Sequence, residues 1–366
     1  MRSDRNLFAD LSVGSDIARA WTLPADLYTD PSVLTHEHQH LFGRTWQVAG
    51  RREQVARPGD YFTCQIADEP LLVVRDGEGK LRAFYNVCRH RAGPPAEGCG
   101  SRKVFRCSYH GWTYGLDGRL ITAPEFEGVQ DFREEEFGLR PVPVEEWAAW
   151  VFVNLDDSAE PLLTALGELT RQAERFPLER MRFFERREYV MQCNWKTYVD
   201  NYLEGYHLPS VHPGLNRELD YGQYVTETFA RHSRQSSPIR GPESERDAPR
   251  RYPDAAGLAA EYFWIFPNWM LNCYPDNVSL NIVMPLAAEQ TLAIFEWYVL
   301  AELMMSDAAQ AGVRFSHETQ LEDGDICEKV QRNLRSRSYQ RGRFSVHQEK
   351  GVHHFHRLYA EWIKRD

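Results

Sequence analysis

Two short pairs of metal-binding residues constrain this 366-residue chain more than any other feature. Cys88 and His90 are separated by one residue, Cys107 and His110 by two, and 16 residues lie between the pairs. Two thiolates and two imidazoles make a complete four-ligand set for metal. This part of the chain therefore has to fold so that two loops meet around one metal site.

The distribution of the four residues distinguishes two kinds of site. Zinc modules usually take each pair from like residues, such as CxxC with HxxxH, whereas here each loop supplies one Cys and one His. That arrangement lets each loop contact both irons of a Rieske [2Fe-2S] cluster, in which thiolates hold one iron and imidazoles the other. Neutral imidazoles raise the potential of such a cluster to roughly −150 to +300 mV, so it can accept electrons from a low-potential reductase. A structural zinc knuckle is the alternative.

The sequence around these residues resembles a known family. NVCRHRAG and FRCSYHGWTYGLDG are similar to the Rieske signature of the ring-hydroxylating oxygenases, down to the YHGW run. The resemblance covers residues 46 to 362 and implies the α (oxygenase) subunit of a Rieske non-haem iron oxygenase. It implies that Cys88, His90, Cys107 and His110 hold the [2Fe-2S] cluster, and that a mononuclear Fe(II) lies elsewhere in the chain. We expect Tyr109 and Trp112 to shield the cluster from solvent.

A second group of polar residues lies in the segment NWKTYVDNYLEGYHLPSVH. Asn201, Glu204 and His207 are spaced three apart, which predicts that they share one helical face. His212 follows, and two neutral imidazoles with one carboxylate form the facial triad that holds Fe(II) with open positions for O₂ and substrate. The segment is predicted to supply the two imidazoles, with Glu204 and Asn201 as candidate catalytic residues beside them.

The spacing of the two histidines requires a break in the helix. His212 lies about 140° round an ideal helix from His207, so an unbroken helix could not direct both at one metal. We expect Pro209 to push Leu208 out of helical geometry and to end the helix. Pro213 would restrain the backbone that follows His212, so that the His212 side chain folds back toward the same metal as His207.

The carboxylate of the triad is assigned by resemblance. The family takes it from an acidic stretch much later in the chain, before a helix with a Gln-containing end. LEDGDICEKVQ is similar to that stretch, with Asp323 eight residues before Gln331, so the metal ligands implied are His207, His212 and Asp323. Asp325 and Glu322 remain alternatives, and an acidic cluster at a helix start can also serve only for capping.

The resemblance gives Glu204 a further role. The family has an acidic residue three before the first iron-binding His, where it bridges to the cluster of a neighbouring subunit. In this sequence the resemblance implies an electron-transfer path from His110 of one subunit through Glu204 to His207 of the next, in a head-to-tail homotrimer. A carboxylate suits the position because it can accept from two imidazole N–H groups. The Glu, with DNYLEGYH, FPN and YPDNVSLNIVMPL, looks most like the choline, carnitine and glycine-betaine monooxygenase branch.

The function implied is that of an oxygenase component. It would use O₂ and electrons from a separate reductase or ferredoxin, and NAD(P)H only through that partner, to hydroxylate or oxidatively N-dealkylate a small substrate, such as a quaternary ammonium compound or betaine. An aromatic-ring hydroxylating (di)oxygenase and a non-catalytic Rieske electron carrier are the alternatives. A cation could be held by an aromatic box. Its candidates are Tyr206, Trp264, Phe266, Trp269 and Tyr274.

The fold class expected is α+β, in three parts. Residues 1–45 form an N-terminal arm packing on the catalytic domain, and residues 46–155 a small antiparallel β Rieske domain. Residues 156–366 form a larger catalytic domain with a curved antiparallel sheet covered by helices, of the helix-grip type. The polar stretch 232–256 is predicted to be a surface excursion.

Composition excludes several other classes. A net charge of −10 disfavours a nucleic-acid partner, and no run of about 18 apolar residues is present for a membrane span. The N-terminal segment does not resemble a signal peptide, which favours a cytoplasmic protein with reduced thiols. Three histidines of the C-terminal stretch, His353, His354 and His356, are expected on the surface.

Overall fold

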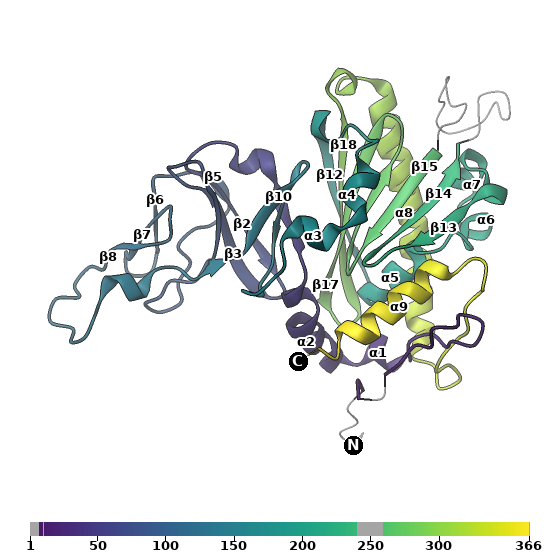
Figure 1. The fold of residues 1–366 in the computed structure, drawn as a ribbon, viewed down its shortest axis with the longest axis horizontal. Coiled ribbons are helices and arrows are strands. Elements are labelled where there is room, and N and C mark those ends of the chain that lie inside the picture. The colour runs from purple at the N-terminus through teal and green to yellow at the C-terminus, as the bar shows by residue number, and fades with distance from the viewer. Residues whose placement is uncertain (1–6, 10, 240–258, 366) are drawn as a thin grey trace. The chain divides into compact units, whose positions relative to one another are not determined.

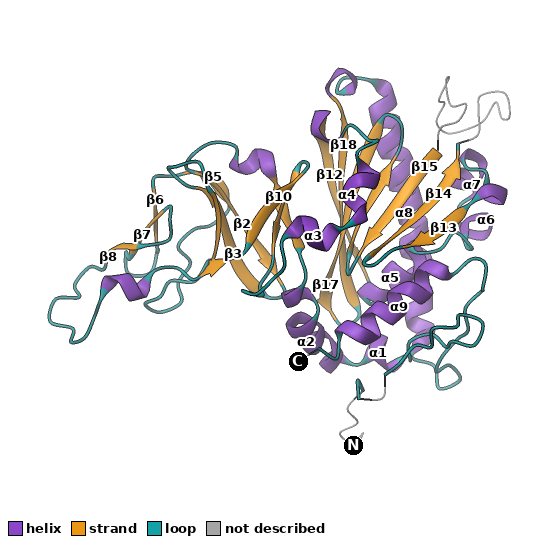
Figure 2. Ribbon diagram, viewed as in Figure 1, coloured by secondary structure: helices purple, strands orange, loops and turns teal. Residues whose placement is uncertain are grey.

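The computed structural model describes residues 7–9, 11–239 and 259–365. The chain divides into two compact units, one of residues 41–165 and one that joins residues 1–40 to residues 166–366. Part of the predicted polar excursion, residues 240–256, lies outside the described residues. Figure 1 shows the course of the chain and Figure 2 its secondary structure.

The unit of residues 41–165 is built from antiparallel strands. They form a five-stranded sheet in the order β5-β2-β3-β4-β9 and two three-stranded sheets, β1-β11-β10 and β6-β7-β8. Its elements are η1 Phe42–Arg44, β1 Gln47–Arg51, η2 Arg52–Val55, β2 Asp60–Ile66, β3 Glu69–Arg75, β4 Leu81–Tyr85, β5 Cys99–Ser101, β6 Val104–Arg106, β7 Thr113–Gly115, β8 Leu120–Thr122, η3 Glu134–Phe137, β9 Pro141–Val142, β10 Val144–Trp147 and β11 Trp150–Val153. One of its apolar clusters contains Cys88 and Cys107, packed with Phe105, Trp112 and Tyr114.

The other unit contains one seven-stranded antiparallel sheet, in the order β12-β18-β17-β16-β15-β14-β13. The strands are β12 Met181–Met191, β13 Val225–Thr228, β14 His232–Pro238, β15 Ala259–Ile265, β16 Trp269–Cys273, β17 Asn277–Ala287 and β18 Gln290–Leu300. The central strands are buried along most of their length, because helices cover the sheet. The α+β class with a helix-covered antiparallel sheet is confirmed.

Two long helices dominate the covering layer (Figure 2). Ser306 caps the first, α8, by accepting a hydrogen bond from the amide of Ala309, and α8 and α9 both pack against α5. The helices of this unit are α1 Asp26–Thr29, α2 Pro31–His40, α3 Leu162–Leu166 at the boundary, α4 Glu168–Ala173, η4 Leu178–Arg180, α5 Trp195–Tyr202, α6 Leu208–Val211, α7 Pro213–Glu218, η5 Tyr221–Gln223, η6 Ala301–Leu303, α8 Asp307–Leu334 and α9 Lys350–Trp362.

A buried ion pair ties the N-terminal residues to this unit. Lys196 Nζ on α5 lies 2.5 Å from Glu37 Oε1 on α2, and neither side chain is exposed. Trp195 Nε1 and Tyr359 OH also donate to the Glu37 carboxylate. Such a pair is tolerated in a low-dielectric core only when its groups have further partners. Here the carboxylate accepts three hydrogen bonds, and the ammonium lies 5.2–5.4 Å from the ring centroids of Tyr28, Trp195 and Tyr359.

Three expectations about this unit were wrong. Residues 232–238, predicted within a surface excursion, form strand β14, where sheet pairing outweighs the polar composition. His353 and His356 are buried rather than on the surface, and His356 Nε2 lies 2.9 Å from Asp200 Oδ1. The acidic stretch around Asp323 lies inside α8 instead of preceding a helix.

Among the described residues, every helix is too short or too polar to pass through a lipid bilayer.

His232 predicts a pH dependence of stability. Burial, with repulsion from His354 and Arg234, lowers the pKa of His232 to about 4. In the unfolded state the pKa of His232 is near 6.5, so between about pH 6.5 and pH 4 the unfolded state binds a proton that the folded state does not bind. Stability therefore falls as pH drops through this range. We expect a loss of about 2 kcal/mol at pH 5 relative to pH 7.5 from this residue, and a smaller loss in His232→Gln.

Urea midpoints at pH 7.5 and pH 5 measure the effect. The exposed His347→Gln should keep the wild-type difference between the two pH values. If His232→Gln keeps it too, the assignment to His232 is wrong.

Candidate metal centre and substrate cavity

The segment carrying the two histidines consists of short helices joined by turns. Helix α5 ends at Tyr202, and α6 begins at Leu208. The predicted continuous helical face was therefore wrong, because Glu204 and His207 lie in the turn beyond α5. The expected helix break at Pro209 was also wrong: Pro209 is the second residue of α6, where a missing amide donor costs nothing.

The turn before α6 depends on a close approach. Gly205 lies against the ring of Tyr224, and a Cβ atom there would come within 2.8 Å of the ring. A larger residue would push the turn away from the cavity wall.

Pro213 has the effect expected of it. His212, the residue before it, has φ −117° and ψ 77°, outside the helical region, as Pro imposes on its neighbour. The chain turns here between α6 and α7, and the ring centroids of His207 and His212 lie 4.9 Å apart.

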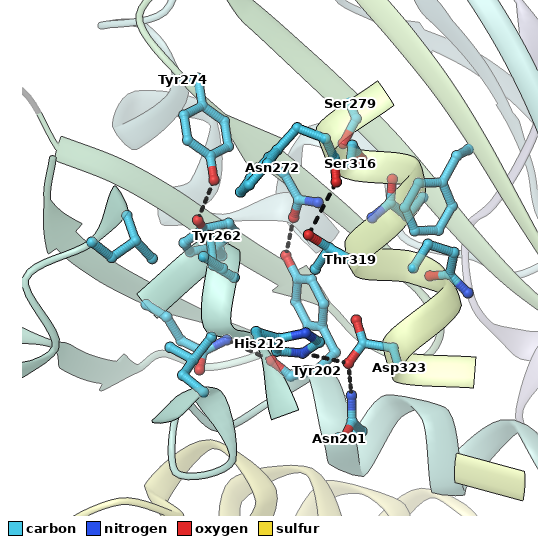
Figure 3. A pocket seen from close by; sticks show the side chains of 18 of the residues that line it. Asn201, Tyr202, His212, Tyr262, Asn272, Tyr274, Ser279, Ser316, Thr319 and Asp323 are labelled. Atoms are coloured by element: carbon cyan, nitrogen blue, oxygen red, sulfur yellow. Dashed lines mark hydrogen bonds and ion pairs between the residues drawn. The ribbon is translucent and has the colours of Figure 1, made fainter. Parts of the chain in front are cut away.

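Asp323 on α8 completes a group of three. One ligand atom each from His207, His212 and Asp323 lie within 4.8 Å of one another. Asp323 Oδ1 is 3.0 Å from His212 Nε2 and accepts a hydrogen bond from Asn201 Nδ2 at 2.5 Å (Figure 3). The same oxygen is 3.7 Å from His207 Nε2. Two imidazoles and one carboxylate in this arrangement fit a facial triad for iron.

The alternative acids have other partners. Asp325 is exposed and forms an ion pair with Lys329. Glu322 Oε2 lies 2.7 Å from His212 Nδ1, on the far side of the ring from Asp323. This geometry favours Asp323 as the ligand and Glu322 as a residue that orients one.

Each histidine thus has a carboxylate on its Nδ1 atom. Glu204 Oε1 is 2.7 Å from His207 Nδ1, the same distance as Glu322 from His212. A proton on each Nδ1 leaves the Nε2 lone pair free for a metal. Burial lowers the pKa of His212, but Asp323 and Glu322 raise it by more, so the net shift is upward. The carboxylates favour positive charge here, as a cation site requires.

A cavity of about 100 Å³ adjoins this group and is rich in aromatic side chains. The predicted aromatic box was largely wrong, because only Tyr274 of its five members lines the cavity. Tyr206 is 57% exposed, and Trp264, Phe266 and Trp269 are buried in the core. Trp264 lies farther along β15 than the cavity and packs on Phe355 of α9.

Sequence reasoning missed most of the aromatic residues that line the cavity. They are Tyr198, Tyr202, Tyr224, Tyr262, Phe295, Trp297 and Phe315. A usable signal was present in VSLNIVM, where Ser279 and Asn281 alternate with apolar residues, because two polar residues on one face of a central strand indicate a cavity.

The four residues of the first motif also lie together, in the other unit. Cys88 and Cys107 are buried, and the rings of His90 and His110 lie 4.7 Å apart between centroids. His90 Nδ1 is buried and has no hydrogen-bond partner within residues 7–9, 11–239 and 259–365, as expected of a nitrogen that binds metal. Burial lowers the pKa of His90, which favours the neutral imidazole that metal needs. These features fit a [2Fe-2S] cluster.

The predicted shielding holds for one of two aromatic residues. Trp112 is buried and stacks on His90 with 5.1 Å between ring centroids. Tyr109 contacts the ring of His110 but is itself 57% exposed. His110 is exposed as well, so this edge of the motif faces outward in the single chain.

Comparisons with known proteins bear on both units. The family model for the Ring hydroxylating alpha subunit (catalytic domain) matches residues 178–365, and that for the Rieske [2Fe-2S] domain matches residues 45–133. The chloroplastic choline monooxygenase of Beta vulgaris is 36% identical over 345 residues, covering 92% of this chain and 76% of the relative. The carnitine monooxygenase oxygenase subunit of Escherichia coli (strain K12) is 32% identical over 369 residues, covering 94% of each.

Solved structures agree. The quaternary ammonium Rieske monooxygenase CntA in complex with the substrate L-carnitine superposes with a TM-score of 0.83 at 29% identity, over 97% of each chain. Naphthalene 1,2-dioxygenase with indole bound in the active site shares the fold, with a TM-score of 0.76 at 19% identity over 94% of this chain and 92% of that one.

The geometry predicts that Asp323 is required for metal. Asp323→Ala should weaken Co(II) binding to metal-stripped protein by more than about a hundredfold, since loss of a ligand exceeds the 10- to 100-fold cost of losing a residue behind one. Equilibrium dialysis with metal analysis measures this. Asp325→Ala removes the same charge from the exposed side of α8 and should bind Co(II) as wild type does. Loss of binding in Asp325→Ala alone would make Asp325 the ligand.

Proposed function

The chain belongs to the family of ring-hydroxylating oxygenase alpha subunits, and from this premise we propose that it is the oxygenase component of a multicomponent monooxygenase acting on a small quaternary ammonium compound. As a member it carries a Rieske [2Fe-2S] cluster and a mononuclear iron, and it depends on a reductase partner for electrons. The substrate class and the residue roles are our proposal.

The observation that carries the substrate class is the state of the cavity tyrosines. Tyr202 OH donates to Asn272 Oδ1 at 2.7 Å, and the hydroxyls of Tyr262 and Tyr274 are 2.5 Å apart (Figure 3). Tyr224 OH donates to Gln235 at 3.2 Å. Because these hydroxyls bond to protein, the rings offer the cavity their apolar and π surface. Such surface binds quaternary ammonium by cation–π contact, without any hydrogen bond to the nitrogen.

Two further observations support this class over the alternatives. The cavity of about 100 Å³ is small beside the roughly 300–1,000 Å³ of pockets for drug-sized ligands, which disfavours fused aromatic rings. The two relatives named above that are more than 30% identical are a choline and a carnitine monooxygenase. A non-catalytic electron carrier would have no use for His207, His212 and Asp323 beside such a cavity.

We assign the site residues as follows. Cys88, His90, Cys107 and His110 hold the cluster, and His207, His212 and Asp323 hold the iron. Iron bound there would supply O₂ activation. The chain's own contribution is orientation: Asn201 donates to the ligand oxygen of Asp323, and Glu204 and Glu322 hold the protons on the two Nδ1 atoms.

We also propose the head-to-tail homotrimer. His110 is exposed in the single chain, and Glu204, with its side chain 13% exposed, can reach solvent beside His207. The structure of a quaternary ammonium Rieske monooxygenase, 30% identical to this chain, gives insights into inter-subunit electron transfer in that protein. In such a ring the cluster edge at His110 would meet Glu204 of the next copy.

Turnover assays test the proposal directly. With a cognate reductase and NADH, choline, carnitine or glycine betaine should stimulate O₂ uptake with formation of an oxidised product, and benzoate should not. Asp323→Ala is the control for uncoupled O₂ uptake by the reductase. Turnover of an aromatic acid alone would transfer the assignment to ring oxygenation.

Replacing Glu204 tests the bridge. Glu204→Gln should keep both metal centres but slow reoxidation of the pre-reduced cluster by O₂ and substrate by about tenfold or more, because an amide can accept from only one imidazole. Stopped-flow absorbance follows the cluster in a single turnover. The exposed Glu227→Gln is the matched control, and equal rates in all three proteins at equal iron content would make Glu204 a bystander.

A further inference from the structure

Two buried polar atoms in the cavity wall have no hydrogen-bond partner among the described residues. They are Nε1 of Trp297 and Oδ1 of Asn281. Trp297 is 2% exposed and Asn281 1% exposed, so bulk water does not solvate them. Buried polar groups are nearly always satisfied, and an exception in a ligand cavity indicates where the ligand bonds.

The sheet brings the two atoms to the same wall. In the pairing of β17 with β18, Ser279 lies opposite Trp297 and Asn281 opposite Phe295. Residues two apart on a strand share a face, so Asn281 and Trp297 are diagonal neighbours, with Cβ atoms roughly 7–8 Å apart. A single small group between the two side chains can therefore contact both.

Several other polar groups of this wall already have partners. Gln235 Nε2 donates to the carbonyl of Tyr202 at 2.8 Å, and Asn272 Oδ1 accepts from Tyr202 OH. The Tyr262 and Tyr274 hydroxyls bond to each other. Among the buried polar side-chain atoms of the residues that line this wall, one donor and one acceptor are left without a partner in the described part of the chain, and they come from the neighbouring strands β18 and β17.

This pair selects a particular chemical group. Indole N–H can only donate and an amide oxygen can only accept. A hydroxyl satisfies both, because it accepts from one and donates to the other. A carboxylate could accept from Trp297 but would face Asn281 Oδ1 with no proton to offer, and a methyl group would leave both unsatisfied.

We propose that Trp297 and Asn281 form a hydroxyl subsite, and that the preferred substrate is a quaternary ammonium alcohol of the choline type, not a betaine whose second polar group is a carboxylate. The proposal rests on the proposed function, since the tyrosine rings have to hold the cation. It adds the residues that bind the hydroxyl end of the substrate.

The test compares ligands that differ only in that group. Isothermal titration of the oxidised holoenzyme, which does not turn over, measures binding of choline, of ethyltrimethylammonium, which lacks the hydroxyl, and of glycine betaine. We expect choline to bind about tenfold or more tightly than either of the others. In Trp297→Phe and Asn281→Leu the ratio of choline to ethyltrimethylammonium affinity should fall toward one.

Two further variants separate the subsite from general damage. Trp264→Phe removes an indole that donates to the carbonyl of Pro267 in the core, away from the cavity, and should keep the wild-type ratio. Asn281→Asp keeps only acceptors at the position and should retain choline binding while weakening glycine betaine. Because each ratio is taken within one variant, a reduced folded fraction does not alter it.

The outcomes distinguish the two levels of the proposal. Equal wild-type affinities for choline and ethyltrimethylammonium would overturn the hydroxyl subsite and leave the quaternary ammonium assignment standing, as would a ratio that survives in both Trp297→Phe and Asn281→Leu. Tighter binding of glycine betaine than of choline would also overturn the subsite. Failure of all three quaternary ammonium compounds to bind, with binding of an aromatic acid, would instead overturn the proposed function.

Discussion

The proposed metal centre depends on the contact between helices α5 and α8, because the residues assigned to it or bonded to its ligands come from both sides of that contact. Asn201 on α5 donates to Asp323 on α8. At the other end of the same contact Gln331 Oε1 accepts from the amide of Asn194 and from Thr197 Oγ1, both at 3.0 Å. Asp323 and Gln331 are eight residues apart and so share a helical face. The Gln noted as part of the acidic segment thus fixes the register that carries the Asp to the histidines.

Helix α5 is held in turn by residues from both ends of the chain. Its Lys196 pairs with Glu37 in the core, and its Asp200 accepts from Tyr28 OH at 2.7 Å and bonds to His356. Breaking a buried pair by removing one partner typically costs about 3–5 kcal/mol, because the other charge remains buried. Helices α1 and α2 are therefore a structural part of the unit that carries the proposed metal centre, although none of the residues assigned to hold the iron lies in them.

Local chemistry predicted which candidate ligands would lie together. The Cys–His spacing identified the cluster motif. The Pro213 after His212 predicted that His212 is not helical, as the turn between α6 and α7 requires. Tertiary contacts determined what the sequence could not reveal. Helix α5 ends at Tyr202, before the Gly205 of the turn and well before Pro209, and β14 is a strand because its neighbours pair with it. His356 is buried because Asp200 and Tyr28 satisfy its ring, and neither is near it in sequence.

The aromatic residues of the cavity could not be predicted for a related reason. Alternation along a strand shows which face of the sheet a side chain lies on, but not whether its position along the strand is next to the cavity. Tyr262 and Trp264 lie on one face of β15, but only Tyr262 lines the cavity. The polarity of the wall depends likewise on the β17–β18 register, because a slip of one residue would exchange the faces.

That register is fixed from the opposite face. There Ile282 lies opposite Ile294, and buried Glu296, opposite Leu280, accepts from Arg186 Nη1 at 3.0 Å and from Tyr298 OH at 2.5 Å. A slip would bury the charge of Glu296 in the cavity without these partners, at a cost that the pairing itself cannot offset. The donor and acceptor proposed to bind the substrate are thus set by packing and charge on the opposite side of the sheet.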